Sequence, residues 1–337
     1  MSRKLKINMI SESVFTVQGH GVHTAFEEMT HALRAQPDTD VIVNKFRRGA
    51  DITHIQTFGP YGLLHLLFGS GKKVVSVHVV PDSLVGSIIG AKYFYGIARW
   101  YMHFFYGRAD LLLSVSKQVD ITLRQQLKVK RPTKVLYNTV NMSLYKTTPA
   151  DKAAARKRLK LSPDATIVAS CGQIQPRKRF DQFCKVARSL PNVQFIWIGG
   201  IPFKHLGADY NEMQRQVDKR PPNVTVTGVI VHDNVRQYLQ AVDVFFLPSS
   251  QENHPMAVLE AAGVGLPIVV RNLSEYNDTF RTDVIRGTDT SFTSIIERLG
   301  KDKNFYADAV KGAQEVAARF DSQAGGALLV KAYQEIL

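Results

Sequence analysis

The sequence predicts an α/β protein of two Rossmann-like domains, each a parallel sheet wound with helices on both faces. Three observations predict this fold class. Short apolar runs alternate with helical stretches along the whole chain, as in parallel sheets with crossover helices. A polar, basic stretch without strand character, residues 138–165, divides the alternation into two halves. The length of 337 residues is large for one core and sufficient for two domains.

The first half contains six apolar runs that we expect to form buried strands, with helical patterns between them. The strands are expected over residues 5–11, 40–44, 52–56, 73–79, 111–116 and 134–138, and helices over residues 23–36 and 117–127.

The second half repeats this arrangement with five apolar runs and four helical segments. The strands are expected over residues 166–172, 193–200, 224–228, 244–249 and 267–272, and the helices over residues 181–190, 211–220, 234–242 and 255–263. We therefore expect an N-terminal domain over residues 1–148, a C-terminal domain over residues 149–316 and a final helical segment over residues 317–337. Such sheets bind ligands at the carboxyl ends of their strands, here the cleft between the domains.

Composition and cysteine usage describe an ordinary globular protein. The two cysteines, Cys171 and Cys184, match neither a disulfide framework nor a common zinc motif, and we interpret them as structural thiols in a reducing cytosol. No signal peptide is expected. The most apolar long stretch, residues 88–107, contains Lys92 and Arg99, each costing about 2.5–3.5 kcal/mol at a bilayer centre, so we expect no spanning helix.

The net charge of +14 is unevenly distributed. Residues 1–150 carry 19 Lys and Arg against 9 Asp and Glu, whereas the remainder carries 24 against 20. A basic half joined to a nearly neutral half indicates that one domain meets something anionic, which could be nucleic acid, an acidic membrane face or a phosphorylated substrate.

Residues 249–270, SSQENHPMAVLEAAGVGLPIVV, form the most informative stretch. A strand ends before it, and Pro255 suits the first turn of a helix because its missing N–H costs nothing there. Asn253 or His254 would cap this helix, and a glycine, Gly263 or Gly265, would end it.

Two glutamates frame the start of this helix. Glu252 is expected in the loop at the carboxyl end of the strand, and Glu260 within the helix, facing the same cleft. Two glutamates at this spacing could also be solvated surface residues. The context favours a site, because N–H groups at a helix start suit hydroxyls and phosphates, and loop carboxylates accept hydrogen bonds from sugar hydroxyls.

This stretch resembles the signature of retaining family-four glycosyltransferases of the GT-B fold, in which two glutamates precede a small-residue helix and an apolar strand. The segments GQIQPRKRFDQF, VTGVIVHDNVRQYLQAVDVFFLPS and LYNTVNMSLY resemble the family in the same order, so the resemblance covers most of the chain. It implies two Rossmann-like domains facing one another across a cleft, with C-terminal helices that return to the first domain.

The resemblance implies a UDP-sugar donor. Glu252 would bind the hydroxyls of the donor sugar, and Glu260 the ribose. Further donor contacts are implied for the backbone of Asn253, His254 and Met256 at the sugar, and of Val229 and Ile230 at the uracil.

The diphosphate needs cations, and this fold typically supplies side chains rather than a metal ion, so neither a metal nor another cofactor is expected. Lys178 matches the phosphate lysine of the family. The family arginine that directly follows the glycine is Gln173 here, and we hypothesise that Arg177 or Arg179 supplies the missing charge. The run PRKR could also be a solvated basic turn.

The resemblance assigns two features of the first domain to the donor. Gly19 and Gly21 precede a helix and would let the backbone approach the diphosphate and acceptor. His78, at the end of the strand 73–79, matches a histidine placed by the reacting face of the donor sugar, although a strand-end histidine can also be structural. In the family the product keeps the configuration of the donor, by same-face attack in which the leaving phosphate takes the acceptor proton. Lys178 and a helix N-terminus would stabilise that phosphate.

The basic half suggests the acceptor. Eight aromatic residues lie between Tyr93 and Tyr106, and five Lys or Arg between Arg124 and Lys134. Aromatic rings with basic side chains suit the interface of an anionic bilayer. A core helix is the alternative, whereas nucleic acid is not expected, because no recognised nucleic-acid module is present. The candidate membrane residues are Lys92, Tyr93, Arg99, Trp100, Tyr101, Phe104, Arg108, Lys128, Lys130 and Arg131.

The opening INMISESVFTVQGHGV resembles Gram-positive glycosyltransferases that extend glucosyl-diacylglycerol to diglycosyl-diacylglycerol. This resemblance implies transfer of glucose or galactose from a UDP-sugar to a glycolipid, by a peripheral enzyme on the cytoplasmic side of the cell membrane. Two alternatives stay open, a glycosyltransferase of polysaccharide or teichoic-acid assembly and a non-catalytic module that binds nucleotide or membrane.

Overall fold

The computed structural model describes residues 3–15, 21–46, 49–84, 93–201 and 210–337, and these form two compact units. Unit 1 consists of the described residues up to Asn141 together with Phe320–Leu337, and unit 2 of those within Met142–Arg319. Each unit contains one six-stranded, wholly parallel sheet with helices on both faces. The predicted fold class of two Rossmann-like domains is confirmed.

The sheet of unit 1 has the strand order β2-β1-β3-β4-β5-β6. Its strands are β1 (Leu5–Ile10), β2 (Thr39–Val43), β3 (Ile52–Ile55), β4 (Lys72–Val77), β5 (Leu111–Ser114) and β6 (Thr133–Val135). The central strands β3 and β5 are buried at every position. Continuous burial explains why these strands are runs of apolar residues rather than alternating patterns.

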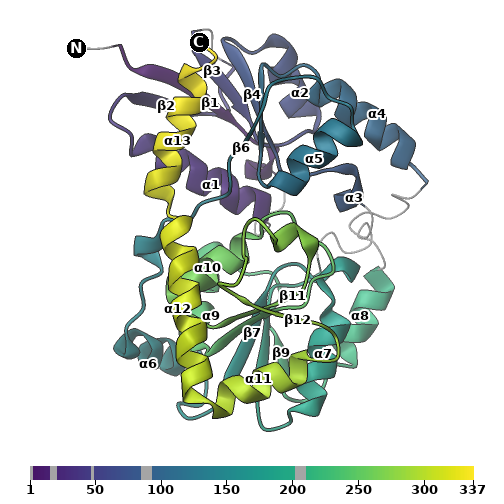
Figure 1. Cartoon of the computed structure of the whole chain (residues 1–337), viewed down its shortest axis with the longest axis vertical. Coiled ribbons are helices and arrows are strands. Elements are labelled where there is room, and N and C mark those ends of the chain that lie inside the picture. The colour runs from purple at the N-terminus through teal and green to yellow at the C-terminus, as the bar shows by residue number, and fades with distance from the viewer. Residues whose placement is uncertain (1–2, 16–20, 47–48, 85–92, 202–209) are drawn as a thin grey trace. The chain divides into compact units, whose positions relative to one another are not determined.

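Helices cover the two faces of this sheet differently (Figure 1). Helices α1 and α13 lie side by side on one face, and α2, α4 and α5 pack on the other. The helices of unit 1 are α1 (Gly21–Arg34), α2 (Pro60–Phe68), α3 (Pro81–Leu84), α4 (Tyr95–Tyr106), α5 (Lys117–Gln125) and α13 (Ser322–Gln334), with a 3-10 turn η1 (Glu12–Val14).

Helix α13 approaches its neighbours very closely. A Cβ atom on Gly326 would lie 2.7 Å from the carbonyl oxygen of Ala32 in α1, and one on Gly325 would lie 2.6 Å from Oγ1 of Thr139. Just before this helix, the backbone N–H of Val140 donates to the carbonyl of Phe320 at 3.0 Å. The end of the chain is therefore an integral part of unit 1.

The sheet of unit 2 has the strand order β12-β11-β10-β7-β8-β9. Its strands are β7 (Ile167–Cys171), β8 (Gln194–Ile198), β9 (Val224–Val226), β10 (Val244–Leu247), β11 (Ile268–Arg271) and β12 (Ile285–Gly287). Five of them correspond to expected strands. The edge strand β12 has only three residues, which is too short to produce an apolar pattern in the sequence.

An aromatic core of Phe180, Phe183, Trp197, Phe246 and Phe292 lies under α7, α8 and α11 on one face of this sheet. Helices α6, α9, α10 and α12 pack against one another. The helices of unit 2 are α6 (Pro149–Arg158), α7 (Phe180–Ser189), α8 (Tyr210–Asp218), α9 (His232–Ala241), α10 (Met256–Val264), α11 (Phe292–Lys301) and α12 (Lys303–Arg319), with 3-10 turns η2 (Met142–Leu144), η3 (Pro176–Lys178) and η5 (Ser274–Tyr276).

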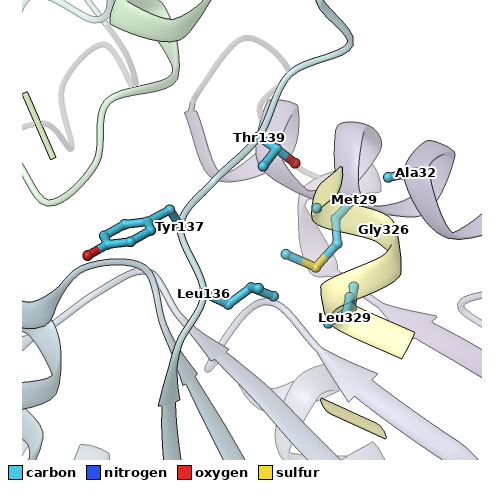
Figure 2. A pocket seen from close by; sticks show the side chains of 8 residues that line it. Met29, Ala32, Leu136, Tyr137, Thr139, Gly326 and Leu329 are labelled. Carbon is cyan, nitrogen blue, oxygen red and sulfur yellow. The ribbon is translucent and has the colours of Figure 1, made fainter. Parts of the chain in front are cut away.

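A small pocket in unit 1 opens between α1, α13 and the chain after β6, beside Met29, Leu136 and Leu329 (Figure 2). It offers about 10 Å³, roughly the room of one water molecule, and therefore cannot hold a sugar or a nucleotide. Among the helices that the structure describes, none has both the length and the apolar character needed to cross a bilayer.

Candidate active site

Two loops of unit 2 meet at the carboxyl edge of its sheet. Strand β7 pairs with β8 on one side and with β10 on the other, so the connections that leave β7 and β10 run in opposite directions. This is the switch point at which open parallel sheets bind their ligands. The loop 172–179 follows β7 and the loop 248–255 follows β10, and both carry predicted site residues.

The loop after β7 requires a glycine at its first position. Gly172 has φ 141°, a conformation that other residues rarely adopt. A Cβ atom at this position would lie 3.4 Å from Cε of Lys178. That distance is an ordinary contact, so the positive φ angle, rather than a lack of space, favours glycine here. The next residue, Gln173, accepts a hydrogen bond from Nε2 of Gln175 at 3.1 Å and brings no charge.

Lys178 and Glu252 form a buried ion pair across the two loops. Nζ of Lys178 lies 2.5 Å from Oε1 of Glu252, and the two side chains are only 11% and 7% exposed. Arg177 adds a second cation, because its Nη1 lies 3.5 Å from Oε2 of Glu252 and donates to the carbonyl of Gln251 at 3.2 Å. The structure thus brings Glu252 together with Arg177 and Lys178, which precede it by 75 and 74 positions in the chain.

Burial and pairing act on this ion pair in opposite directions. Burial is the largest influence on Lys178 and lowers the pKa of its ammonium group, while Glu252 partly offsets that effect. Burial alone would raise the pKa of Glu252, but Lys178 and Arg177 together outweigh it and lower the pKa of the carboxyl group. Glu252 is therefore an anion at neutral pH, held between two cations.

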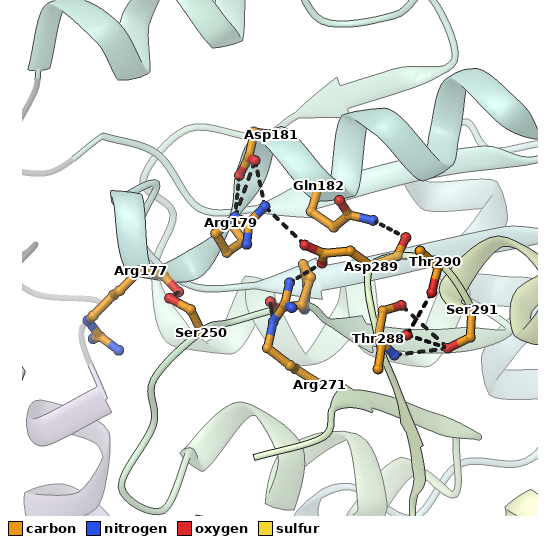
Figure 3. A network of polar contacts seen from close by, with 11 residues as sticks. Arg177, Arg179, Asp181, Gln182, Ser250, Arg271, Thr288, Asp289, Thr290 and Ser291 are labelled. Atoms are coloured by element: carbon orange, nitrogen blue, oxygen red, sulfur yellow. Dashed lines mark hydrogen bonds and ion pairs between the residues drawn. The ribbon is translucent and has the colours of Figure 1, made fainter.

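Arg179 belongs to a separate network in unit 2 (Figure 3). Its guanidinium donates to Asp181 at 2.9 Å and lies 3.5 Å from Asp289, which also accepts from Arg271. Arg177 points away from this network in the same view. Of the two arginines in our hypothesis for the phosphate clamp, the structure places Arg177 beside Glu252 and pairs Arg179 with other carboxylates.

The loop after β10 leads into α10. Met256 is the first helical residue, and Pro255, rather than Asn253 or His254, occupies the cap position and makes no side-chain cap hydrogen bond. The expected cap by Asn253 or His254 is therefore wrong. His254 instead stacks on Phe280 with ring centroids 5.3 Å apart and an angle of 11°. At the other end, Gly265 adopts φ 84° and terminates the helix, as one of the two predicted glycines.

Glu260 lies on α10 and is 3% exposed. Its Oε1 lies 2.7 Å from Nε2 of His232, the first residue of α9. The segment before α9 contains Val229 and Ile230, which follow Gly228 in a left-handed conformation with φ 72°. The proposed ribose residue and the proposed uracil residues thus belong to neighbouring parts of unit 2, joined through His232.

Unit 1 contains the remaining donor-site predictions. His78 follows β4, is partly buried, and its Nε2 lies 2.7 Å from Oε1 of Gln56. Gly21 is the first residue of α1. Gly19 lies outside the described residues.

The predicted membrane helix corresponds to α4. Tyr93 is 90% exposed, Trp100 is 64% exposed and stacks on Phe104, and Arg108 lies over the ring of Phe104 at 3.4 Å from its centroid. Tyr101 departs from the expected side: it packs against the core and donates from its hydroxyl to the carbonyl of Phe58 at 2.7 Å.

Ile97 and Trp100 of α4 are exposed and lie three positions apart, on one face of the helix. Tyr93 is exposed in the turn before the helix. Lys92 lies outside the described residues. The remaining basic candidates are exposed: Arg99, Arg108, Lys128, Lys130 and Arg131.

Sequence reasoning missed several buried polar residues beside the predicted site residues. Tyr276 is fully buried, and its pKa is raised well above the ordinary value, first by burial and then by the charge of Glu252. His54, Gln56 and Ser76 lie beside His78, on or directly after strands β3 and β4 of unit 1, and form hydrogen bonds with one another. A signal existed for these three, because polar residues recur at every second position in ITHIQ and VSVHV, which are otherwise apolar. Within the described part of the chain, no three His, Cys, Asp or Glu side chains gather as they would around a metal ion.

Known proteins similar to this chain are glycosyltransferases. Residues 151–316 match the family described as glycosyl transferases group 1. The alpha-galactosylglucosyldiacylglycerol synthase of Streptococcus pneumoniae is 33% identical over 278 residues, which are 81% of this chain and 74% of that protein. The processive diacylglycerol alpha-glucosyltransferase of Acholeplasma laidlawii is 26% identical over 236 residues, 69% of this chain and 69% of that protein.

Two solved structures share the architecture over nearly the full length. Sucrose-phosphate synthase from Thermosynechococcus elongatus has a TM-score of 0.81 at 18% identity and covers 99% of both chains. Anabaena HepE in complex with UDP and glucose has a TM-score of 0.78 at 18% identity, covering 98% of this chain and 99% of the other. At these identities the likeness shows the fold, which is the GT-B fold.

Proposed function

The chain belongs to the group 1 glycosyl transferases, and from this premise we propose that it transfers glucose or galactose from a UDP-sugar to a glycolipid such as monoglucosyl-diacylglycerol. The product keeps the configuration of the donor. The observation that carries this proposal is the buried Lys178–Glu252 pair at the switch point of unit 2. The name of the Streptococcus pneumoniae relative, a galactosylglucosyldiacylglycerol synthase, supports the class of acceptor.

The ion pair suits a site that receives a sugar diphosphate. Oε1 of Glu252 accepts from Lys178, while a carboxylate has about four lone-pair sites, so the same group can accept hydrogen bonds from sugar hydroxyls. Lys178 and Arg177 supply positive charge where the diphosphate would lie. The contact with Glu252 orients the lysine before the donor binds and partly offsets the lowering of its pKa by burial.

The reaction proceeds without a protein nucleophile. The bond from the anomeric carbon to the β-phosphate oxygen breaks, the acceptor hydroxyl oxygen forms a new bond to that carbon on the same face, and its proton passes to the leaving phosphate. Lys178 and the first-turn N–H groups of α10 oppose the negative charge that develops on the diphosphate. Glu260 holds the ribose hydroxyls, and the backbone at Val229 and Ile230 contacts the uracil.

A transfer assay tests this proposal. The purified protein is incubated with UDP-glucose or UDP-galactose and monoglucosyl-diacylglycerol in anionic vesicles, and the lipids are analysed by mass spectrometry. We expect a product heavier by one hexose with one of the donors, and we expect EDTA to leave the rate unchanged. Lys178→Met should lower kcat/KM by about 10²–10³-fold, the usual loss when a preorganised transition-state donor is removed.

Glu297→Gln is the matched control, because it breaks an exposed ion pair with Lys301 on α11. This variant should leave kcat/KM nearly unchanged. Absence of product with both donors and every lipid acceptor would contradict the proposal. A product on a polyol-phosphate or polysaccharide acceptor alone would indicate polysaccharide or teichoic-acid assembly instead. Binding of UDP without transfer or donor hydrolysis would indicate a non-catalytic module.

We further propose that unit 1 binds the anionic, cytoplasmic face of the membrane through α4. The exposed side chains of Ile97 and Trp100 on α4, with Tyr93 in the turn before it, provide apolar area, and Arg99 on the helix provides charge. The basic residues Lys128, Lys130 and Arg131 add attraction to acidic lipids, at about 1 kcal/mol each near such a surface. Peripheral attachment would bring the protein to a lipid-anchored acceptor.

Vesicle sedimentation tests this surface. Trp100→Ala combined with Ile97→Asp should weaken binding to anionic vesicles by at least tenfold, because both the apolar area and the charge balance change. Leu328→Asp is the control, since Leu328 is 56% exposed on α13, which covers the opposite face of the same sheet. Equal loss of binding in both variants would contradict the assignment to α4.

A further inference from the structure

A row of buried polar side chains crosses the face of the unit 1 sheet that α1 and α13 cover. Side chains along a strand alternate between faces, so His54 and Gln56 at β3 point to the same face as Ile52, and Ser76 and His78 at β4 follow the same rule. The side chains of His54, Gln56 and Ser76 are at most 3% exposed. Polar groups buried this deeply are expected to be hydrogen-bonded.

The row connects α13 to His78. The hydroxyl of Tyr333 lies 2.6 Å from Nδ1 of His54. Nε2 of His54 lies 3.1 Å from Nε2 of Gln56, whose Oε1 lies 2.7 Å from Nε2 of His78. Ser76 also contacts His54, with its Oγ 2.8 Å from Nε2 of that ring.

The sulfur of Met29 fixes the orientation of the amide in this row. The thioether is only an acceptor and lies 3.1 Å from Nε2 of Gln56, so the amide nitrogen must face α1 and His54. The carbonyl oxygen of Gln56 then faces His78, and Nε2 of His78 must carry a proton to donate to it. His54 accepts from Gln56 at Nε2 and donates from Nδ1 to Tyr333.

Burial keeps the middle of the row neutral. It lowers the pKa of His54 to about 3, with a smaller contribution from His78, and raises the pKa of Tyr333 well above its ordinary value. These are the titratable groups that the row brings toward His78. A neutral amide next to His78 directs the ring without attracting a proton as a carboxylate would.

We propose that Gln56 is a positioning residue for His78, held in place by His54 and Tyr333. The amide fixes the plane of the imidazole and its tautomer, with the proton on Nε2 and the lone pair on Nδ1. The ring is thereby held in one orientation toward the bound hexose, a role that rests on the function proposed above. The last helix of the chain thus contributes to the donor site through Tyr333, without contacting the donor.

The tautomer of His78 can be measured without any ligand. In protein labelled with 15N-histidine, with the His78 signals assigned by a His78→Gln variant, we expect the neutral ring to be protonated at Nε2. Gln56→Leu should produce a mixture of both tautomers. Gln56→Glu should raise the pKa of His78 by at least about one unit, because a carboxylate replaces the amide.

The control is Thr53→Val, one residue before His54 on β3. Thr53 points to the opposite face and donates to the carbonyl of Ser70 at 2.6 Å, so this variant removes a buried hydrogen bond without touching the row. It should destabilise the protein and leave the His78 tautomer unchanged. An unchanged tautomer in Gln56→Leu would overturn the proposal.

Kinetics separate this proposal from the function on which it rests. Gln56→Leu should lower kcat for hexose transfer by about tenfold and change KM for the UDP-sugar by less than about twofold, because orientation is lost while the donor-binding groups of unit 2 remain. A changed tautomer with unchanged kcat would overturn the role in transfer. If the wild-type protein transfers no hexose, the proposed function fails, and the NMR comparison still decides whether Gln56 positions His78.

Discussion

The two units bury different kinds of polar groups beside similar sheets. Unit 2 buries ionisable groups, with Lys178 against Glu252, and Glu260 beside the partly exposed ring of His232. Unit 1 buries a neutral row that contains His54, Gln56 and Tyr333. Charge is expensive to bury and is retained only where each group has a partner, whereas a neutral row costs less and mainly fixes geometry. Under the proposed function, unit 2 would supply electrostatic stabilisation and unit 1 orientation.

The largest expected effect concerns the charged pair of unit 2. Lys178→Met or Glu252→Gln alone should lower the free energy of unfolding by about 3–5 kcal/mol, because each leaves a buried charge without its partner. The double variant should cost clearly less than the sum of the two. Urea unfolding of the four proteins measures this coupling. The same cycle on the exposed pair Lys301–Glu297 should give a coupling near zero, and additive losses for Lys178 and Glu252 would refute the comparison.

A second test asks which cations of unit 2 belong to the site. Arg177→Ala should weaken UDP binding by about tenfold, in line with the loss of one charge-assisted hydrogen bond. Arg179→Ala should change UDP affinity little and mainly loosen the contacts with Asp181 and Asp289. Isothermal titration with UDP compares the two variants. Equal affinity in both would remove Arg177 from the proposed clamp.

Removing one group from the neutral row of unit 1 should lower the free energy of unfolding less than breaking the ion pair of unit 2. Tyr333→Phe removes a hydroxyl and leaves Nδ1 of buried His54 without this partner, which should cost about 1–3 kcal/mol of stability. UDP affinity should stay unchanged, because the donor nucleotide is assigned to unit 2. Chemical unfolding and UDP titration give the two readings. A strong loss of UDP affinity in Tyr333→Phe would contradict the assignment of nucleotide binding to unit 2 alone.

A pH dependence is expected in both units. Burial lowers the pKa of His54 and of His254 to about 3, from an ordinary value of 6.5. Each histidine is neutral when folded and takes up a proton when unfolded below pH 6.5, so stability is fully present above pH 6.5 and falls as the pH decreases toward 3. The slope should approach about 1.4 kcal/mol per pH unit for each histidine.

Unfolding measured between pH 7 and 5 tests this slope, a range in which carboxylates remain ionised. His54→Asn should flatten it by the share of one histidine. A His31→Asn variant serves as the comparison, because His31 is exposed on α1 and should leave the slope unchanged. A slope that is the same in the wild type and in His54→Asn would contradict the assignment.

Much of the fold followed from the sequence, because buried parallel strands leave apolar runs that are easy to recognise. The placement of Glu252 at the end of β10, and the end of α10 at Gly265, followed from local patterns. The partner of Glu252 was harder to predict from the sequence. Lys178 came from a family resemblance, and the sequence alone could not show that the two loops meet, since strand order determines that contact.

Other features depended on tertiary packing that no local pattern records. Tyr101 lies one position from Trp100, and that rotation of about 100° turns it into the core. The sequence position of Arg179 suits a phosphate ligand as well as that of Arg177 does. In the structure, however, Arg179 already forms ion pairs with Asp181 and Asp289. Tyr333 is 279 positions from His54, so its contact is invisible without the fold.

The discontinuity of unit 1 has a consequence for biosynthesis. The strands of this unit and its first helices precede unit 2 in the chain, but Leu329 and Tyr333 of its core follow unit 2. Unit 2 is complete once Arg319 has emerged. We therefore expect unit 2 to reach its native state during synthesis before unit 1 does, which reverses the usual N-terminal-first order and leaves one face of the first sheet open to chaperones until α13 has been made.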